Sequence, residues 1–141
     1  MRDNEKLGKL GEELVAKLLD LTLSEDKYDM KKDGVTSDGT YVEIKTQNRH
    51  PRGYFTVRRD YSNQLKKCKS VDRLIFVEYD STNDIKIWEC HDRNHIEYDT
   101  KSGLPMAGWH IKDMELLHIH NDPELANKMK KLSSAKQFTN A

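Results

Sequence analysis

The sequence predicts an α/β domain in which helices and strands alternate along the chain. Three observations predict this class: a leucine stripe at helical spacing near the N-terminus, strand-like alternation after residue 27, and a nearly continuous apolar run at residues 72–79. A chain of 141 residues suits one domain with a single core. We therefore expect one domain over residues 1–141.

The first half of the chain predicts a helix, three strands and a second helix. Apolar residues at steps of three and four predict the first helix, from about residue 4 to residue 20. They are Leu7, Leu10, Leu14, Leu18 and Leu21. Strand-like patterns follow at residues 27–35, 40–47 and 54–58, and "SDG" joins the first two. Residues 60–70 predict a short helix that Asp60 or Ser62 caps.

The second half predicts two strands, a loop and a last helix. "DRLIFVEY", residues 72–79, has the pattern of a strand buried on both faces, and residues 85–90 predict its neighbour. The Gly and Pro content of residues 99–108 predicts a loop, and residues 109–120 fit either a strand pair or a short helix. Asp122 at the N-cap and Pro123 in the first turn predict a helix to about residue 132, followed by a frayed tail over residues 133–141.

Composition limits the class of protein. Hydrophobic residues make up 35% of the chain and charged residues 34%, and the longest apolar run is short, so we expect no membrane span. The charged N-terminus does not resemble a secretory signal, and Cys68 and Cys90 are too far apart for a CxxC site. We expect reduced cysteines and a cytoplasmic protein.

Positive charge gathers in one stretch although the net charge is zero. Between residues 45 and 73 nine basic residues face only two acidic ones, Asp60 and Asp72. The basic residues are Lys45, Arg49, Arg52, Arg58, Arg59, Lys66, Lys67, Lys69 and Arg73. Such a cluster is either a solvated surface or a local nucleic-acid contact.

The pair Glu43 and Lys45 lies in "DGTYVEIKTQ", residues 38–47. Chance alone gives about one Glu-x-Lys in a chain of this composition, so the bare pattern carries little information. Its context is more informative, because on a strand Glu43 and Lys45 share one face with Tyr41, while alternate residues face the packing. The strand would hold an acid and a base side by side.

The loop "SDG" decides which residue lies opposite Glu43. A three-residue loop with Gly39 in a left-handed bulge places Thr36 opposite Thr40 and Asp33 opposite Glu43. A two-residue turn places Gly34 opposite Glu43 instead. In the first register two facing carboxylates require a cation, and such oxygen ligands suit Mg²⁺.

These motifs resemble the PD-(D/E)XK nuclease superfamily, which has the restriction-endonuclease-like fold. The resemblance covers about residues 4–90, and "DGVTSDGTYVEIK" supplies the motif, with Lys32 where the namesake proline would stand. It implies an αβββαβ core with a mixed central sheet flanked by helices. Residues 91–132 would then form a C-terminal β/α extension.

The resemblance extends to the first helix and to the second. "GKLGEELVAKLL" resembles the family's helix motif and places Glu12 at the border of the leucine stripe, with Glu13 on the other border. Gln64 resembles a glutamine that some relatives place near the metal, although Cys68 stands where they carry a tyrosine.

The resemblance implies a metal-dependent DNA endonuclease of the restriction-like, homing or junction-resolving type. Asp33, Glu43 and the carbonyl of Ile44 would bind Mg²⁺ or Mn²⁺, with Glu12 reaching it directly or through water, and Lys45 would assist the attacking water. Contacts to DNA would come from Arg49, Arg52, Arg58, Arg59, Lys66 and Lys67. Cutting both strands would need a dimer or higher oligomer, and we expect a homo-oligomer of this kind.

Two other classes of function stay open. The first is a catalytically inactive nuclease-fold module that binds DNA or a protein. The second is a histidine-based metalloprotein built on His118 and His120, which lacks an evident third ligand. "HDRNH", residues 91–95, is too tight for an HNH nuclease motif, and Trp88 and Trp109 fit the core better than a base-stacking surface.

Overall fold

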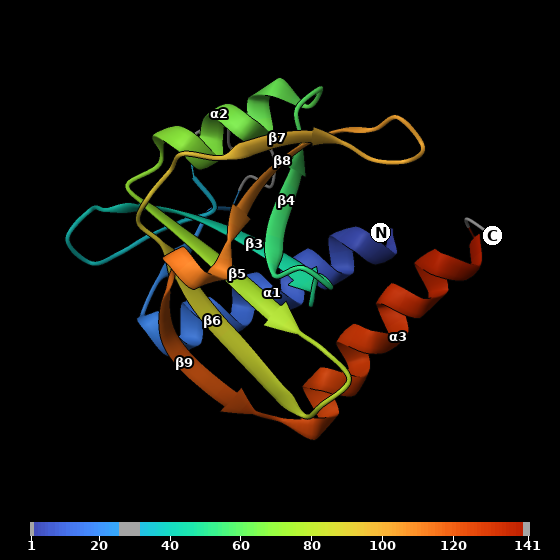
Figure 1. Ribbon diagram of the computed structural model, residues 1–141. Helices are drawn as coiled ribbons and strands as arrows, with labels where there is room; N and C mark the ends of the chain where they lie inside the picture. Colours follow the sequence, from blue (N-terminus) through green and yellow to red (C-terminus); the bar gives the residue numbers. More distant parts are fainter. Residues whose placement is uncertain (1, 26–31, 140–141) are drawn as a thin grey trace.

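A mixed sheet of six strands forms the centre of the molecule (Figure 1). The computed structural model describes residues 2–25 and 32–139. The strand order is β1-β2-β3-β5-β6-β9, in which β3 and β5 are parallel and all other neighbours antiparallel. The strands are β1 (Thr22–Leu23), β2 (Gly34–Val35), β3 (Tyr41–Asn48), β5 (Arg73–Tyr79), β6 (Asp84–Cys90) and β9 (Glu115–Asn121). This confirms the predicted α/β fold with a mixed central sheet.

A second sheet of three strands lies against the first and has the order β4-β8-β7. It contains β4 (Tyr54–Arg58), β8 (Pro105–His110) and β7 (Ile96–Asp99). The predicted strand at residues 54–58 is therefore confirmed, but it belongs to this sheet. The loop predicted over residues 99–108 was wrong at residues 105–108, because β4 offers β8 a complete antiparallel partner from Tyr54↔His110 to Arg58↔Met106.

The side chain of Gln47 joins the two sheets. It leaves β3, donates through Nε2 to the carbonyl of Tyr54 (2.7 Å) and accepts through Oε1 from the N–H of Thr56 (3.0 Å). Both partners belong to β4, so β3, which carries Glu43, is tied to the smaller sheet by side-chain as well as apolar contacts.

Helices cover the central sheet on both faces. Helices α1 (Asp3–Leu19) and α3 (Pro123–Thr139) pack side by side on one face, where Val15, Val42, Ile75 and Met129 are fully buried (Figure 1). Helix α2 (Ser62–Ser70) and the small sheet cover the other face. The burial of β5 between the two layers confirms the strand predicted from its apolar run.

The connections between elements correct or confirm several local predictions. Helix α2 begins after Tyr61 without a side-chain cap, so the predicted cap from Asp60 or Ser62 was wrong; Asp60 instead pairs with Arg58 at 2.5 Å. Asp122 does cap α3, accepting from the N–H of Leu125 at 3.0 Å.

Residues 109–120 form the end of β8, a 3₁₀ turn η1 (Ile111–Asp113) and β9. Most of the strand predicted at residues 27–35 lies outside the described residues, which show β2 at its end. Across the described part of the chain, α1 to α3 are all too short or too polar to cross a membrane.

Replacing Gly11 with alanine is expected to destabilise the protein, because α1 approaches β3 most closely there. A Cβ at Gly11 would lie 1.8 Å from Oγ1 and 3.0 Å from Cβ of Thr46, so rotating the threonine side chain relieves only part of the clash. Gly8→Ala is the matched control, since a Cβ there meets nothing within 4 Å. Both variants gain about 1 kcal/mol of helix propensity. The overpacking at Gly11 costs about 1–3 kcal/mol. In urea unfolding Gly8→Ala should be more stable than Gly11→Ala by that amount, and equal stabilities would contradict the packing described here.

Candidate active site

The β2–β3 hairpin has the register predicted for a three-residue loop, and Asp33 lies directly before β2, where its N–H donates to the carbonyl of Val42 at 2.8 Å. The paired residues are Gly34↔Val42 and Val35↔Tyr41, as the three-residue loop predicts. Gly39 has a φ of 87°, and the N–H of Thr36 donates to the carbonyl of Thr40 at 3.0 Å. Glycine adopts this left-handed conformation without strain, so the loop can close with three residues. The loop length in turn fixes the face of the hairpin on which Asp33 lies.

The hairpin and α2 bring two carboxylates and two lysines together. The Lys45 ammonium lies 3.2 Å from Glu43 Oε2, and the Lys67 ammonium lies 3.0 Å from Asp33 Oδ1 and 3.2 Å from Glu43 Oε1. Asp33 Oδ2 accepts a hydrogen bond of 2.8 Å from the backbone N–H of Ile44. The four charged side chains thus form one cluster on the face of β3 that points away from α1.

The Glu43 carboxylate is fully buried yet poorly satisfied. Its exposure is 0%, and among the described residues neither of its oxygens has a donor in hydrogen-bond geometry, although both lie near ammonium groups. A buried carboxylate without such donors is costly unless a cation binds it. Asp33 and Glu43 are hard oxygen ligands, so the residues present fit a divalent cation of the Mg²⁺ or Mn²⁺ type.

Burial and mutual proximity shift the pKa values of the acids in opposite directions. Burial, and after it the adjacent Asp33 carboxylate, with which Glu43 can share a proton, together raise the pKa of Glu43 to about 8. Burial alone would raise the pKa of Asp33, but its contacts with Glu43, the Ile44 N–H and Lys67 outweigh burial and lower it. The neutral form is thus favoured at Glu43 and the charged form at Asp33.

Without divalent metal, the free energy of unfolding is expected to fall as the pH rises from about 4.5 to about 8. Over this window folded Glu43 keeps its proton while the unfolded chain has lost it, so a higher pH favours unfolding. Glu12, whose pKa is raised to about 7, lowers the free energy of unfolding in the same way up to that pH. The pKa of Asp33 is lowered from 3.8, so this acid affects stability only below this pH window. Urea unfolding in EDTA across this range measures the slope. Glu43→Gln should flatten it, Glu13→Gln on the exposed side of α1 serves as control, and a wild-type slope in Glu43→Gln would contradict the burial of that acid.

Glu12 lies within electrostatic reach of the cluster. Burial raises its pKa to about 7, and Asp33 adds to the rise while Lys67 and Lys45 oppose it. Its side chain is half-buried, whereas Glu13 is exposed, as their positions on α1 predict. Glu12 does not, however, come close enough to Asp33 and Glu43 for the three acids to lie within 4.8 Å of one another in the described structure.

Helix α2 supplies further contacts to the strand. Gln64 Oε1 accepts from the Lys45 ammonium at 3.3 Å, which puts this glutamine beside the cluster, and Cys68 is buried one turn later. Burial raises the pKa of the Cys68 thiol to about 12, so it is a neutral packing group at pH 7. Charge alone indicated Lys67 only as a DNA contact, and no pattern in the sequence indicated that it would approach Asp33 and Glu43.

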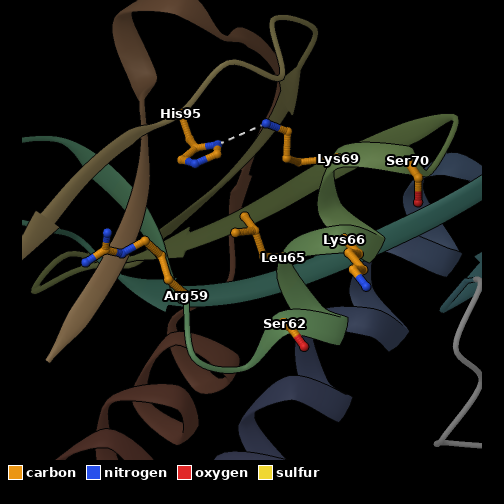
Figure 2. A pocket seen from close by; sticks show the side chains of 7 residues that line it. All are labelled: Arg59, Ser62, Leu65, Lys66, Lys69, Ser70 and His95. Carbon is orange, nitrogen blue, oxygen red and sulfur yellow. Dashed lines mark hydrogen bonds between the residues drawn. The ribbon is translucent and has the colours of Figure 1, made fainter.

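The other basic residues predicted to contact DNA lie outside the cluster. Arg49 and Arg52 are exposed in the β3–β4 connection. Arg58 pairs with Asp60, and Arg59 pairs with Glu97 (3.2 Å) and Asp99 (2.7 Å). Figure 2 shows Arg59 and the exposed Lys66 at a hollow of about 640 Å³ between α2 and β7. The remaining residues of its lining are Ser62, Leu65, Lys69, Ser70 and His95.

The alternative motifs do not assemble a second centre. His118 and His120 lie on β9, and His120 approaches Asp122 at 3.4 Å rather than a group of metal ligands. In residues 2–25 and 32–139 the one trio of possible ligands within 4.8 Å is Glu89, His91 and Glu115. Its buried member, Glu89, is already paired with Arg73 at 2.6 Å.

The motif "HDRNH" has a structural role, which its spacing did not reveal. The Arg93 guanidinium donates to four backbone carbonyls, which lie in the last turn of α2, in the two residues between α2 and β5, and at the last residue of β6. They belong to Cys68, Val71, Asp72 and Cys90. Trp109 is buried, as predicted, and donates to the Arg93 carbonyl at 3.1 Å.

A mixed central sheet flanked by helices, with an Asp–Glu pair and a lysine on its central hairpin, defines the class of nucleases with the restriction-endonuclease-like fold. The chain belongs to the PD-(D/E)XK nuclease superfamily: the model of this superfamily's nuclease domain matches residues 1–113. No curated protein matches the chain. Membership supports nuclease activity, and members of this superfamily generally use divalent metals.

Proposed function

We propose that this protein is a divalent-metal-dependent DNA endonuclease that hydrolyses phosphodiester bonds at the Asp33–Glu43–Lys45 cluster. The observation that supports it most strongly is the fully buried Glu43 carboxylate beside Asp33, whose two oxygens each lie 3.2 Å from a lysine ammonium and thus in a place that attracts cations. A fold selected only for stability would gain nothing from such a carboxylate. A site that binds a cation, in contrast, uses the negative charge of such a carboxylate.

Asp33 and Glu43 would hold Mg²⁺ or Mn²⁺, with the Ile44 carbonyl and Glu12 as further ligands, the latter directly or through water. The chemistry supplied by the bound ion is polarisation of the scissile phosphate and a lower pKa for the attacking water. The Ile44 N–H keeps the Asp33 carboxylate oriented through its 2.8 Å hydrogen bond. This contact would help to preorganise the two acids for the cation.

Lys45 would orient the attacking water and stabilise negative charge on the phosphoryl oxygens. Its ammonium lies between Glu43 Oε2 (3.2 Å) and Gln64 Oε1 (3.3 Å), so two elements fix its position. Burial opposes its charge, but Glu43 and other nearby acidic groups outweigh burial and raise the pKa of Lys45, which keeps it protonated at pH 7. Protonated Lys45 would therefore act as a positively charged hydrogen-bond donor and not as the general base.

DNA would approach over the exposed basic residues outside the cluster. Arg49, Arg52 and Lys66 are exposed, and Arg58 and Arg59 could exchange their carboxylate partners for phosphates. Contacts of this kind position the duplex without reading its sequence. We further propose a cytoplasmic protein, in keeping with its two free cysteines, both buried.

One observation favours the alternative, an inactive nuclease-fold module that binds DNA or protein. Lys67 already pairs with both Asp33 and Glu43, so these acids have a cation partner without any metal. Against it stands the register of the hairpin, since a module without catalysis has no need for two facing carboxylates.

Cleavage of a substrate panel separates these two functions. The panel contains supercoiled plasmid, linear duplex, single strand and a four-way junction, each with Mg²⁺ or EDTA. The proposal predicts cutting that EDTA stops, and the best substrate names the type of nuclease. Linear plasmid product would indicate a dimer acting on both strands, and nicked product one site acting alone. Binding without cutting of any DNA would establish the alternative.

A further inference from the structure

The four oxygens of Asp33 and Glu43 are divided between fixed partners and Lys67. Asp33 Oδ2 accepts from the Ile44 N–H, and Glu43 Oε2 faces the Lys45 ammonium. The two remaining oxygens, Asp33 Oδ1 and Glu43 Oε1, lie 3.0 and 3.2 Å from the single Lys67 ammonium. Lys67 therefore bridges the two acids at the oxygens that the rest of the hairpin leaves available.

Lys67 differs from the surface lysines beside it. Its side chain is 13% exposed, whereas Lys66 and Lys69 on the same helix are exposed. Cys68 is buried next to it, and Leu65 packs against the same apolar cluster, so α2 is anchored to the sheet and carries Lys67 to the acids. A lysine whose only task was to contact DNA would gain nothing from this placement.

We propose that the Lys67 ammonium acts as an internal competitor of the divalent cation, occupying the cation's place between Asp33 and Glu43 until a metal displaces it. This inference rests on the proposed function, because it assumes that these acids are the metal ligands. An ammonium and a metal ion are both attracted by the negative charge of this acid pair, but both cannot lie close to Asp33 Oδ1 and Glu43 Oε1 at once.

The competition stabilises the metal-free protein and weakens metal binding by the same contact. Removing Lys67 leaves the two acids without their bridging cation, which should lower the stability of the metal-free protein. Without Lys67, a metal ion can bind without first breaking that ion pair, which should tighten metal binding. A lysine that merely supported the site would have the opposite effect on affinity, since its loss would loosen the ligands.

Calorimetric titration of the full chain with Mn²⁺ tests this competition without any catalytic readout. Lys67→Met should bind Mn²⁺ about tenfold or more tightly than wild type, a size typical of coupling between two linked binding events. Lys69→Met is the matched control, since it removes the same charge from the same helix but contacts His95 at 3.3 Å instead of the acids (Figure 2). Equal or weaker Mn²⁺ binding by Lys67→Met, relative to Lys69→Met, would overturn the inference.

Asp33→Asn separates this inference from the proposed function. If Asp33→Asn abolishes Mn²⁺ binding while Lys67→Met leaves it unchanged, the metal site stands and the competition is wrong. If Asp33→Asn binds Mn²⁺ as wild type does, the metal lies elsewhere and both proposals fall.

Thermal unfolding guards against a variant that folds poorly, with Lys67→Gln as a second and more polar replacement. In EDTA both Lys67 variants should melt below wild type, and on adding Mn²⁺ both should gain more in Tm than wild type gains. A gain equal to or smaller than that of wild type in folded Lys67→Gln, checked by circular dichroism, would contradict the competition.

Discussion

Glu43→Gln is expected to reduce the rate of DNA cleavage by about 10³-fold or more, because loss of several kcal/mol of charge stabilisation by the metal has an effect of that size. Glutamine keeps the volume of the side chain in a position that is 0% exposed, so the fold should persist. It removes the charge that the cation needs, so Mg²⁺ should no longer bind productively. Single-turnover cleavage of the best substrate at saturating Mg²⁺ measures the loss.

DNA binding by Glu43→Gln should remain close to that of wild type. The exposed arginines and lysines that would contact phosphates are untouched, so a gel-shift titration in EDTA should give a similar dissociation constant. Glu13→Gln, on the exposed side of α1, is the matched control for loss of one acid and should cleave normally. Cleavage by Glu43→Gln at the wild-type rate would contradict the assignment of this residue.

Lys45→Met is expected to slow cleavage by about 10²–10³-fold, the usual cost of removing one preorganised donor to developing negative charge. The variant keeps both acids and Lys67, so Mn²⁺ affinity should change far less than the rate. This split between affinity and rate distinguishes Lys45 from the metal ligands and from Lys67.

The measurement for Lys45→Met pairs Mn²⁺ titration with single-turnover cleavage, and Lys101→Met in the exposed β7–β8 loop is the control. Loss of Mn²⁺ binding in parallel with the rate would show that Lys45 holds Glu43 in place instead of acting on the phosphate. An unchanged rate would exclude Lys45 from the reaction.

Local sequence patterns predicted the helices and strands well where the pattern reports burial directly. The leucine stripe placed the first helix within one residue of α1, which spans Asp3–Leu19, and the apolar run identified β5. Pairing between distant strands was not readable in the same way. Alternation marks residues 54–58 as a strand, but nothing in that stretch names β8, whose Gly108 lies opposite Thr56, as its partner.

The candidate site was predicted in its parts and only conditionally in its geometry. The spacing of Glu43 and Lys45 on one strand fixes their shared face, but two loop lengths were compatible with "SDG", and only the three-residue loop brings Asp33 to the same place. Lys67 could not be predicted at the cluster, because its approach depends on how α2 packs on the sheet. Charge in the sequence shows that a lysine is present but not which carboxylate it will meet.

In the proposed function, Asp33 and Glu43 hold the cation on which DNA hydrolysis depends. Anomalous diffraction from crystals of the protein soaked in Mn²⁺ tests this most directly, because the signal locates the ion without reference to activity. We expect an anomalous peak between Asp33 and Glu43, with the Lys67 ammonium moved away from both. A peak only at Glu89, His91 and Glu115, or none at the Asp33–Glu43 pair at saturating Mn²⁺, would contradict it.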